Sequence, residues 1–299
     1  MTRIICVGHA ALDRIYRVED LPAGPTKTRA LEHVETGGGM AANAAAAIAK
    51  LGGEVELWSR VGDDDAGVRI RRGLESAGVD IRGVERFEGA RSSTSAVIVD
   101  RNGERMIVGA RDIDMPSATS WLPLERMEGA DAVLADLRWL EAVRAAFTHA
   151  RSLAIPTILD ADLGARDALP ELLALTDYAI FSEGALESFL PDLDLRDRLD
   201  RIMLYGPRHA GVTLGERGYV WRDPFGGGTV PAFDVATVDT TGAGDAFHGA
   251  FTLALSEGQA IRHCAQFAAA VAALKCQRLG ARAGLPVRAE VETFIKTAT

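Results

Sequence analysis

Between about residue 130 and residue 214, short apolar runs alternate with longer amphipathic runs, and this alternation limits the folds open to the chain. The apolar runs have the length of buried strands, and the runs between them have helical spacing of apolar residues. The predicted strands are 132–135, 155–160, 177–181 and 210–214, and the predicted helices are 139–152, 167–175, 183–190 and 195–203. Such alternation is typical of a parallel sheet covered by helices on both faces. We therefore expect an α/β fold.

The N-terminal third has a different pattern. Residues 3–8 form a short apolar run typical of a buried central strand. Residues 12–36 and 84–109 alternate more loosely and carry many polar residues, which predicts strands with one solvent-exposed face. We expect these two segments to form a small β lid over the main sheet, within a single domain that spans residues 1–299. The other predicted elements are helices 40–51, 68–77, 244–256, 259–279 and 287–297 and strands 55–61, 218–222 and 229–236.

The segment Asp239-Thr240-Thr241-Gly242-Ala243-Gly244-Asp245 lies where a strand-like run would pass into a helix. Gly242 and Gly244 can adopt backbone angles closed to other residues and let a ligand approach the main chain. The free amides of Ala243, Gly244 and Asp245 would then lie at a helix N-terminus, where unpaired N–H groups favour an anion. A carboxylate at Asp245 could simply cap the helix, but it would repel a bound anion. A group that accepts a proton from a nucleophile attacking that anion resolves the conflict. The segment therefore predicts phosphoryl transfer, with Asp245 as general base and the amides of Gly242, Ala243 and Gly244 as catalytic donors.

Composition excludes several classes of protein. The net charge of −9 and pI of about 5.3 give no general basic field for nucleic acid or an anionic membrane. The N-terminal apolar run, Ile4 to Val7, is too short for a signal peptide or a membrane span. The three cysteines, Cys6, Cys264 and Cys276, are odd in number and show no C-x-x-C spacing, which favours a reducing compartment. We expect a cytoplasmic protein with no nucleic-acid or membrane partner.

The segment 239–245 resembles the D-T-x-G-A-G-D signature of the ribokinase-like (PfkB) carbohydrate kinases, with every fixed position filled. The resemblance covers essentially the whole chain. It implies a ribokinase-like three-layer sandwich with a mostly parallel central sheet and a small β lid, which often serves as the contact of a homodimer. The implied reaction transfers the γ-phosphoryl group of ATP, with Mg²⁺, to a primary hydroxyl of a sugar, and a ketose is the first candidate.

A second glycine-rich segment, residues 37–43, is similar to the family's G-G-x-x-x-N sugar-binding motif. The resemblance implies that Gly38, Gly39 and Asn43 bind the sugar. The alternative is a helix entry in which Asn43 bonds to the nearby backbone. Asp13 matches the family's acidic sugar ligand, and a carboxylate can accept hydrogen bonds from two adjacent hydroxyls.

Further positions concern the nucleotide and the metal ions. Residues 213–218 resemble the family's T-x-G-x-x-G nucleotide loop, which implies nucleotide contacts at Thr213, Gly215 and Gly218. Asp239 matches a position that often helps to hold a monovalent cation such as K⁺, although a turn-forming Asp is an equal alternative. The family's N-x-x-E, which organises Mg²⁺ and phosphate, is replaced here, and Glu183 is the candidate substitute.

Two cations point to an anionic sugar. Lys27 lies in a predicted lid strand and Arg138 follows the strand 132–135, and together they match two sulfonate-binding positions of the sulfofructose kinase branch. That branch phosphorylates 6-deoxy-6-sulfofructose and also uses an asparagine, where this chain has Gly109, with Arg111 nearby as a candidate replacement. The stretches similar to that branch are 13–16, 61–65, 134–139 and 272–276. Solvated surface cations are the alternative.

Several rival functions stay open or fall away. A nucleoside, fructose, ribose or 2-keto-3-deoxygluconate kinase of the same superfamily remains open, as does a non-catalytic sugar or nucleotide sensor. No G-x-x-x-x-G-K-[ST] or protein kinase motif occurs. The glycines come too late in the chain for an NAD dehydrogenase. His248, about one turn after Asp245, either touches the site or packs its helix.

Overall fold

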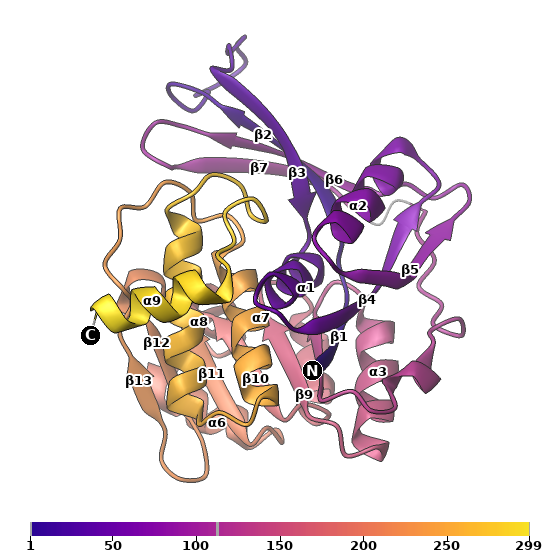
Figure 1. The fold of residues 1–299 in the computed structure, drawn as a ribbon, viewed down its shortest axis with the longest axis vertical. Coiled ribbons are helices and arrows are strands. Elements are labelled where there is room, and N and C mark those ends of the chain that lie inside the picture. Colours follow the sequence, from indigo (N-terminus) through magenta and orange to yellow (C-terminus); the bar gives the residue numbers. More distant parts are fainter. Residues whose placement is uncertain (1, 112–113, 299) are drawn as a thin grey trace.

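The computed structural model describes residues 2–111 and 114–298, and its main layer is a nine-stranded sheet within those residues (Figure 1). Its spatial order is β13-β12-β11-β10-β9-β8-β1-β4-β5. The strands are β1 Arg3–Val7, β4 Glu54–Gly62, β5 Asp80–Phe87, β8 Ala132–Asp136, β9 Thr157–Ala161, β10 Tyr178–Ser182, β11 His209–Thr213, β12 Tyr219–Arg222 and β13 Gly228–Val230. Neighbours from β5 to β11 pair in parallel, and β12 and β13 add antiparallel pairs at one edge. The predicted α/β sandwich is confirmed.

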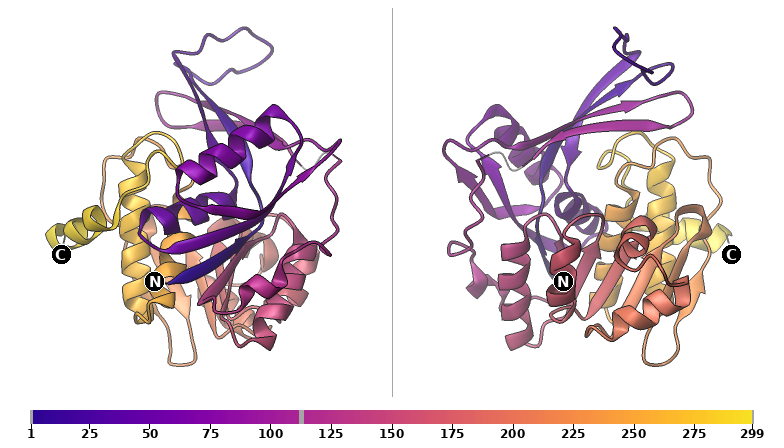
Figure 2. Two further views of the ribbon diagram at one scale, coloured as in Figure 1. Left: turned by 45° about the vertical axis from the view of Figure 1, so that its right-hand side comes forward. Right: turned by 180° about the vertical axis from the view of Figure 1, so that it is seen from behind.

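The sheet is buried on both faces because successive side chains of a strand point to opposite sides. In β1, Ile4 and Cys6 pack in one core and Ile5 and Val7 in the other. The first core is covered by α1 Met40–Lys50, α2 Asp65–Ser76, α7 Ala243–Ser256, α8 Ile261–Cys276 and α9 Arg288–Ala298. The second is covered by α3 Leu140–Ser152, α4 Leu169–Leu173, α5 Glu183–Phe189 and α6 Leu195–Met203 (Figure 2). Short 3₁₀ turns are η1 Leu124–Met127, η2 Arg166–Ala168 and η3 Gly215–Arg217.

A four-stranded second sheet forms the lid, which projects from one end of the main sheet (Figure 1). Its strands, in the order β3-β2-β6-β7, are β2 Ala11–Arg17, β3 Glu32–Gly38, β6 Ser93–Val99 and β7 Arg105–Ala110. A small core of Ile15, Val97 and Val99 packs on one face of the lid. The edge strand β7 is exposed along its whole length.

Three predicted boundaries were wrong. Residues 84–87 belong to β5, which pairs with β4 in the main sheet, because Ile81 and Val84 bury their side chains in the main core. The lid strand expected to include Lys27 begins only at Glu32, so Lys27 lies in the exposed β2–β3 loop. The strand expected to run to residue 236 ends at Val230, since Pro231 has no N–H to continue the ladder.

None of the helices in the residues that the structure describes is long and apolar enough to cross a membrane.

Candidate active site

Helix α7 begins at the signature segment, residues 239–245, with its first-turn amides largely free. Gly242 caps the helix in the left-handed region, at φ 74°, and no side chain of residues 2–111 or 114–298 forms a hydrogen bond that caps this end. Among the described residues, none accepts a hydrogen bond from the amides of Gly242, Gly244 or Asp245. The predicted donor Ala243 differs, because the turn made by Gly242 directs its N–H to the Thr240 carbonyl at 3.2 Å. The helix start therefore offers three amides to an anion, and Asp245 takes the place of Ala243 in the set predicted to contact the transferred group.

The Asp245 side chain meets Asn43 because α1 and α7 pack unusually closely. A Cβ at Gly249 of α7 would lie 2.5 Å from the backbone of Ala44 in α1, so only glycine permits this approach. The approach brings Asn43 Nδ2 within 2.7 Å of Asp245 Oδ2, to which it donates a hydrogen bond. Asn43 itself is buried. The carboxylate is therefore held in one orientation by a residue that lies 202 positions away in the chain.

The pKa of Asp245 is raised to about 7, chiefly by burial of the carboxyl and further by the negative charge of Asp160. The hydrogen bond from Asn43 opposes this rise. A general base works best when its pKa lies near the working pH, so Asp245 is suited to accept a proton from a hydroxyl at neutral pH.

His248 packs the helix instead of entering the site. Its ring nitrogens lie 2.7 Å from the Gly244 carbonyl oxygen and 3.3 Å from the Ile180 carbonyl oxygen. Nε2 is also 3.4 Å from Asp160 Oδ1. Burial lowers the pKa of His248. The ring therefore joins α7 to β10 and β9, in line with the packing alternative.

The predicted sugar ligands converge at the start of α1. Asp13 accepts a hydrogen bond from Ser95 across the lid at 2.5 Å, and burial raises the pKa of Asp13. A Cβ at Gly38 would lie 2.1 Å from the Asp13 carboxylate, and one at Gly39 would lie 2.4 Å from the His9 carbonyl oxygen. Bare backbone at Gly38 therefore lets the loop approach Asp13, and bare backbone at Gly39 lets it approach His9.

Arg282, which no sequence motif indicated, contacts Asn43 and Gly38 of the predicted sugar site. Its Nε donates to Asn43 Oδ1 at 2.9 Å, and its Nη2 donates to the Gly38 carbonyl at 2.8 Å. Burial lowers the pKa of Arg282 to about 10, and the charges of Asp13 and Asp245 oppose that change. The guanidinium thus fixes the Asn43 amide so that its nitrogen faces Asp245. A single arginine inside the small-residue run Gly280-Ala281-Arg282-Ala283-Gly284 was the available signal.

The lid also contacts the signature segment directly. Arg105, at the start of β7, donates from Nη1 to Thr240 Oγ1 at 2.6 Å. The lid strand was predicted, but nothing in its sequence pattern indicated this contact.

The two cations proposed for an anionic sugar are not brought together. Arg138 lies at the carboxyl end of β8, with Nη2 3.8 Å from Asp162 Oδ2. Lys27 is exposed in the β2–β3 loop, which extends beyond the lid strands at the end away from the main sheet (Figure 1). Gly109 and Arg111 are exposed at the end of β7.

A cavity of about 960 Å³ opens beside the start of α7. The predicted nucleotide residues Thr213, Gly215 and Gly218 line it together with Ala243 and Gly244. Its apolar wall consists of Phe233, Val235, Phe247, Ala269, Ala272 and Ala273. This combination of an apolar slot with free helix amides suits a nucleoside base followed by phosphates.

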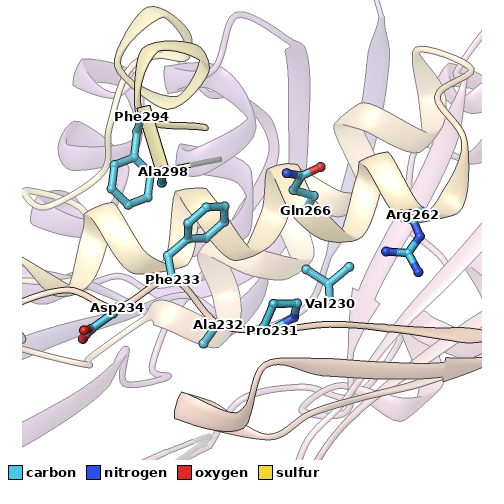
Figure 3. A pocket seen from close by; sticks show the side chains of 9 residues that line it. All are labelled: Val230, Pro231, Ala232, Phe233, Asp234, Arg262, Gln266, Phe294 and Ala298. Atoms are coloured by element: carbon cyan, nitrogen blue, oxygen red, sulfur yellow. The ribbon is translucent and has the colours of Figure 1, made fainter. Parts of the chain in front are cut away.

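A smaller cavity of about 450 Å³ adjoins the first and shares residues 232–234 with it (Figure 3). Phe233 and Phe294 face each other on one side, with ring centroids 5.0 Å apart, and Arg262 and Gln266 of α8 line the other side. None of the predicted site residues lines it.

The candidate metal ligands already have protein partners. Glu183, the first residue of α5, forms an ion pair with Arg217 of η3. Asp239 is buried beside the ammonium group of Lys275. In the described ranges, no three His, Cys, Asp or Glu side chains gather in a way that could hold a metal ion.

Comparison with known proteins identifies the family. The family model described as "pfkB family carbohydrate kinase" matches residues 1–288 of this chain. An ATP-dependent ribose-1-phosphate kinase of Halopiger xanaduensis is 32% identical over 99% of this chain and 98% of its own length. Fructokinase-1 of Zea mays is 31% identical over 99% of this chain and 98% of its own. A crystal structure from Agrobacterium tumefaciens, provisionally identified as a ribokinase, has a TM-score of 0.95 and 36% identity, and covers 99% of this chain and 98% of its own. The chain therefore belongs to the pfkB family of carbohydrate kinases.

Proposed function

We propose that this carbohydrate kinase transfers the γ-phosphoryl group of ATP to a primary hydroxyl of a free sugar, with a ketose as the first candidate. One observation carries the proposal. Asp245, with its pKa raised to about 7, lies between the nucleotide cavity and the group formed by Asp13, Gly38 and Asn43. A hydroxyl held by that group has the base on the side that faces the phosphates.

Each part of the site has a task in this reaction. Asp13 and the bare backbone at Gly38 and Gly39 bind and orient the sugar hydroxyls. Asp245 takes the proton as the hydroxyl oxygen attacks phosphorus, and the bond to the leaving ADP oxygen breaks. The free amides at the start of α7 stabilise the charge on the transferred group. Thr213, Gly215 and Gly218 bind the nucleotide.

We propose that the phosphoryl donor is ATP with Mg²⁺, and a crystal structure of an E. coli protein with this fold contains both. Mg²⁺ is usually held by substrate phosphates, water and one or two carboxylates, which fits a site without a dedicated metal cluster among the described residues. When bound, the ion neutralises charge on the phosphates. Glu183 remains the predicted protein contact, and it would have to leave its ion pair with Arg217 to serve.

The second candidate substrate is an anionic sugar such as 6-deoxy-6-sulfofructose. It rests on Arg138, whose partly exposed guanidinium lies at the carboxyl end of β8 and is 3.8 Å from Asp162 Oδ2. The Halopiger relative is likewise named for an anionic sugar, ribose 1-phosphate. The neutral ketose is favoured because Lys27 lies in the β2–β3 loop, which extends beyond the lid strands away from the main sheet (Figure 1). In addition, Gly109 has no side chain that could bind a sulfonate.

The test is an ADP-release assay with fructose, ribose, 6-deoxy-6-sulfofructose, ribose 1-phosphate, 2-keto-3-deoxygluconate and nucleosides. We expect the largest kcat/KM with fructose, the neutral ketose, and a kcat about 10²- to 10⁴-fold lower with the same sugar for Asp245→Asn. Preference for a nucleoside would favour the nucleoside kinase. Sugar or nucleotide binding without ADP release from the native enzyme would make the chain a sensor.

The proposal includes a homodimer formed through the lid, because β7 exposes Met106, Ile107 and Val108 on an edge strand. Light scattering should give twice the chain mass, and Val108→Glu should reduce it to the monomer. A native monomer would contradict this part of the proposal. We also propose a cytoplasmic location, where ATP is supplied and the three unpaired cysteines stay reduced.

A further inference from the structure

Lys275 is a fully buried charged residue that the proposed reaction does not use. It lies in the last turn of α8, and its side chain has no exposed surface. Its Nζ donates to the Asp239 carbonyl oxygen at 2.6 Å and lies 3.7 Å from Asp239 Oδ2. Burying an ammonium group is costly unless it is paired. A residue kept there only to fill space would be apolar, as Ala268 and Val271 on the same helix are.

Asp239 connects this ammonium to the signature segment. Its Oδ1 accepts the Thr241 amide and its Oδ2 accepts the Gly280 amide, each at 2.8 Å. Gly242, the cap of α7, follows directly and packs on Ala281, whose Cβ would lie 2.7 Å from a Cβ at that glycine. The position of the free amides of α7 therefore depends on the Lys275–Asp239 pair.

A separate monovalent cation does not fit beside Asp239. Both carboxylate oxygens already accept an amide, and the carbonyl oxygen accepts Lys275 Nζ. A second cation would lie within a few ångströms of a buried ammonium, where like charges repel strongly.

We infer that the Lys275 ammonium is the built-in cation of this site: it takes the place predicted for K⁺ beside Asp239 and fixes residues 239–242, so that turnover does not depend on a monovalent metal ion. Lys275 is a positioning residue, since it contacts Asp239 and lies behind the amides that face the phosphates. It maintains the geometry of the helix start before any ligand arrives.

The first experiment needs no variant. The native enzyme is assayed for ADP release with its best sugar in tetramethylammonium chloride, NaCl and KCl at one ionic strength. Equal rates are expected. Stimulation by K⁺ would overturn the inference, whereas absence of turnover with every sugar would count against the proposed function, so the two failures are distinguishable.

The second experiment removes the charge. Lys275→Ala opens a space the size of a small cation, and we expect kcat to fall by about 10²-fold, the effect of displacing reacting groups by about 1 Å. K⁺, NH₄⁺ or methylammonium should restore part of that loss, and tetramethylammonium should not. Lys275→Met, which fills the space, should lose turnover without rescue. Lys296→Met in the exposed part of α9 is the matched control and should behave as native.

A readout independent of activity is the melting temperature. K⁺ should raise it for Lys275→Ala and leave it unchanged for the native protein, because an ion that binds only the folded state stabilises that state. A folded Lys275→Ala with native kcat in tetramethylammonium would overturn the inference. So would a folded, inactive Lys275→Ala that no cation rescues, since the side chain would then act by packing alone. If neither variant folds, the native cation series decides.

Discussion

Replacing Asp245 by asparagine tests the central chemical argument. Asparagine keeps the shape of the side chain, and its carbonyl oxygen can still accept the 2.7 Å hydrogen bond from Asn43. It cannot accept a proton at any working pH. The variant therefore removes the base and leaves the geometry of the site in place.

We expect kcat to fall by about 10²- to 10⁴-fold, the usual contribution of a general base. Because each tenfold change corresponds to about 1.4 kcal/mol, the barrier rises by about 3–5.5 kcal/mol. The KM values for sugar and ATP should change little, since Asp13 and the nucleotide cavity are untouched. Initial rates of ADP release give both quantities, and Asp192→Asn on the exposed surface is the matched control.

The raised pKa of Asp245 also predicts two pH effects. For the native enzyme, kcat/KM should fall about tenfold per pH unit below about 7, because the protonated carboxyl is no base. For stability, the folded state holds a proton between pH 3.8 and about 7 that the unfolded state has lost, so the carboxylate destabilises the fold above that range. The rise of the pKa from 3.8 to about 7 lowers the free energy of unfolding above pH 7 by at most about 4 kcal/mol. The reduction is smaller where solvent screens the partly exposed carboxylate.

Asp245→Asn should therefore melt above the native protein at pH 8, and the difference should vanish near pH 4. Scanning calorimetry at both pH values measures it. Near-native turnover of the variant would remove Asp245 from the mechanism. A flat native pH profile, or a lower melting temperature for the variant at pH 8, would refute the argument that burial sets this pKa.

Three other substitutions test separate parts of the site. Arg282→Met should raise the KM for the sugar by about tenfold, because it removes a charged hydrogen bond to Asn43, and should change the KM for ATP little. Equal changes of both KM values in steady-state assays would contradict the place of Arg282 on the sugar side. Gly242→Ala should lower the free energy of unfolding in urea by about 1–3 kcal/mol, because φ of residue 242 is 74° and the new Cβ would lie 2.7 Å from the Cβ of Ala281. Native stability of this variant would refute the cap geometry. Arg138→Ala should reduce kcat/KM for 6-deoxy-6-sulfofructose more than for fructose, and an equal reduction would assign Arg138 to structure alone.

The parts of the fold that the sequence predicted are those in which local pattern and tertiary position agree. The buried parallel strands have continuous apolar runs, so β8 to β11 were placed to within about two residues. The errors fall where a strand's partner decides its sheet. Residues 84–87 have the same mixed pattern as a lid strand, and their place in the main sheet follows from the register with β4, which no local signal contains.

The same distinction applies to the site. Asp245, Asn43 and the nucleotide glycines lie in contiguous motifs, so their residue types and spacing could be interpreted before their positions were known. Arg282 acts through its contact with Asn43, which lies 239 positions away in the chain, and Lys275 through its contact with Asp239, 36 positions away. Neither belongs to a motif that states its partner. A charged residue inside a small or apolar run was the one local signal, and it indicates burial without naming what the charge meets.

The geometry of the base is therefore set by three segments together and not by the signature segment alone. The signature supplies Asp245 and the free amides, and the α1 motif supplies the Asn43 amide. Residues 275–282 fix both segments, because Lys275 donates to Asp239 and Arg282 donates to Asn43. Because Asn43 accepts from Arg282 with its oxygen, its nitrogen is the group left to face Asp245. That orientation gives the carboxylate a donor, which limits the rise of its pKa that burial and Asp160 produce. A base poised near neutrality thus requires the C-terminal segment as much as the motif that contains it.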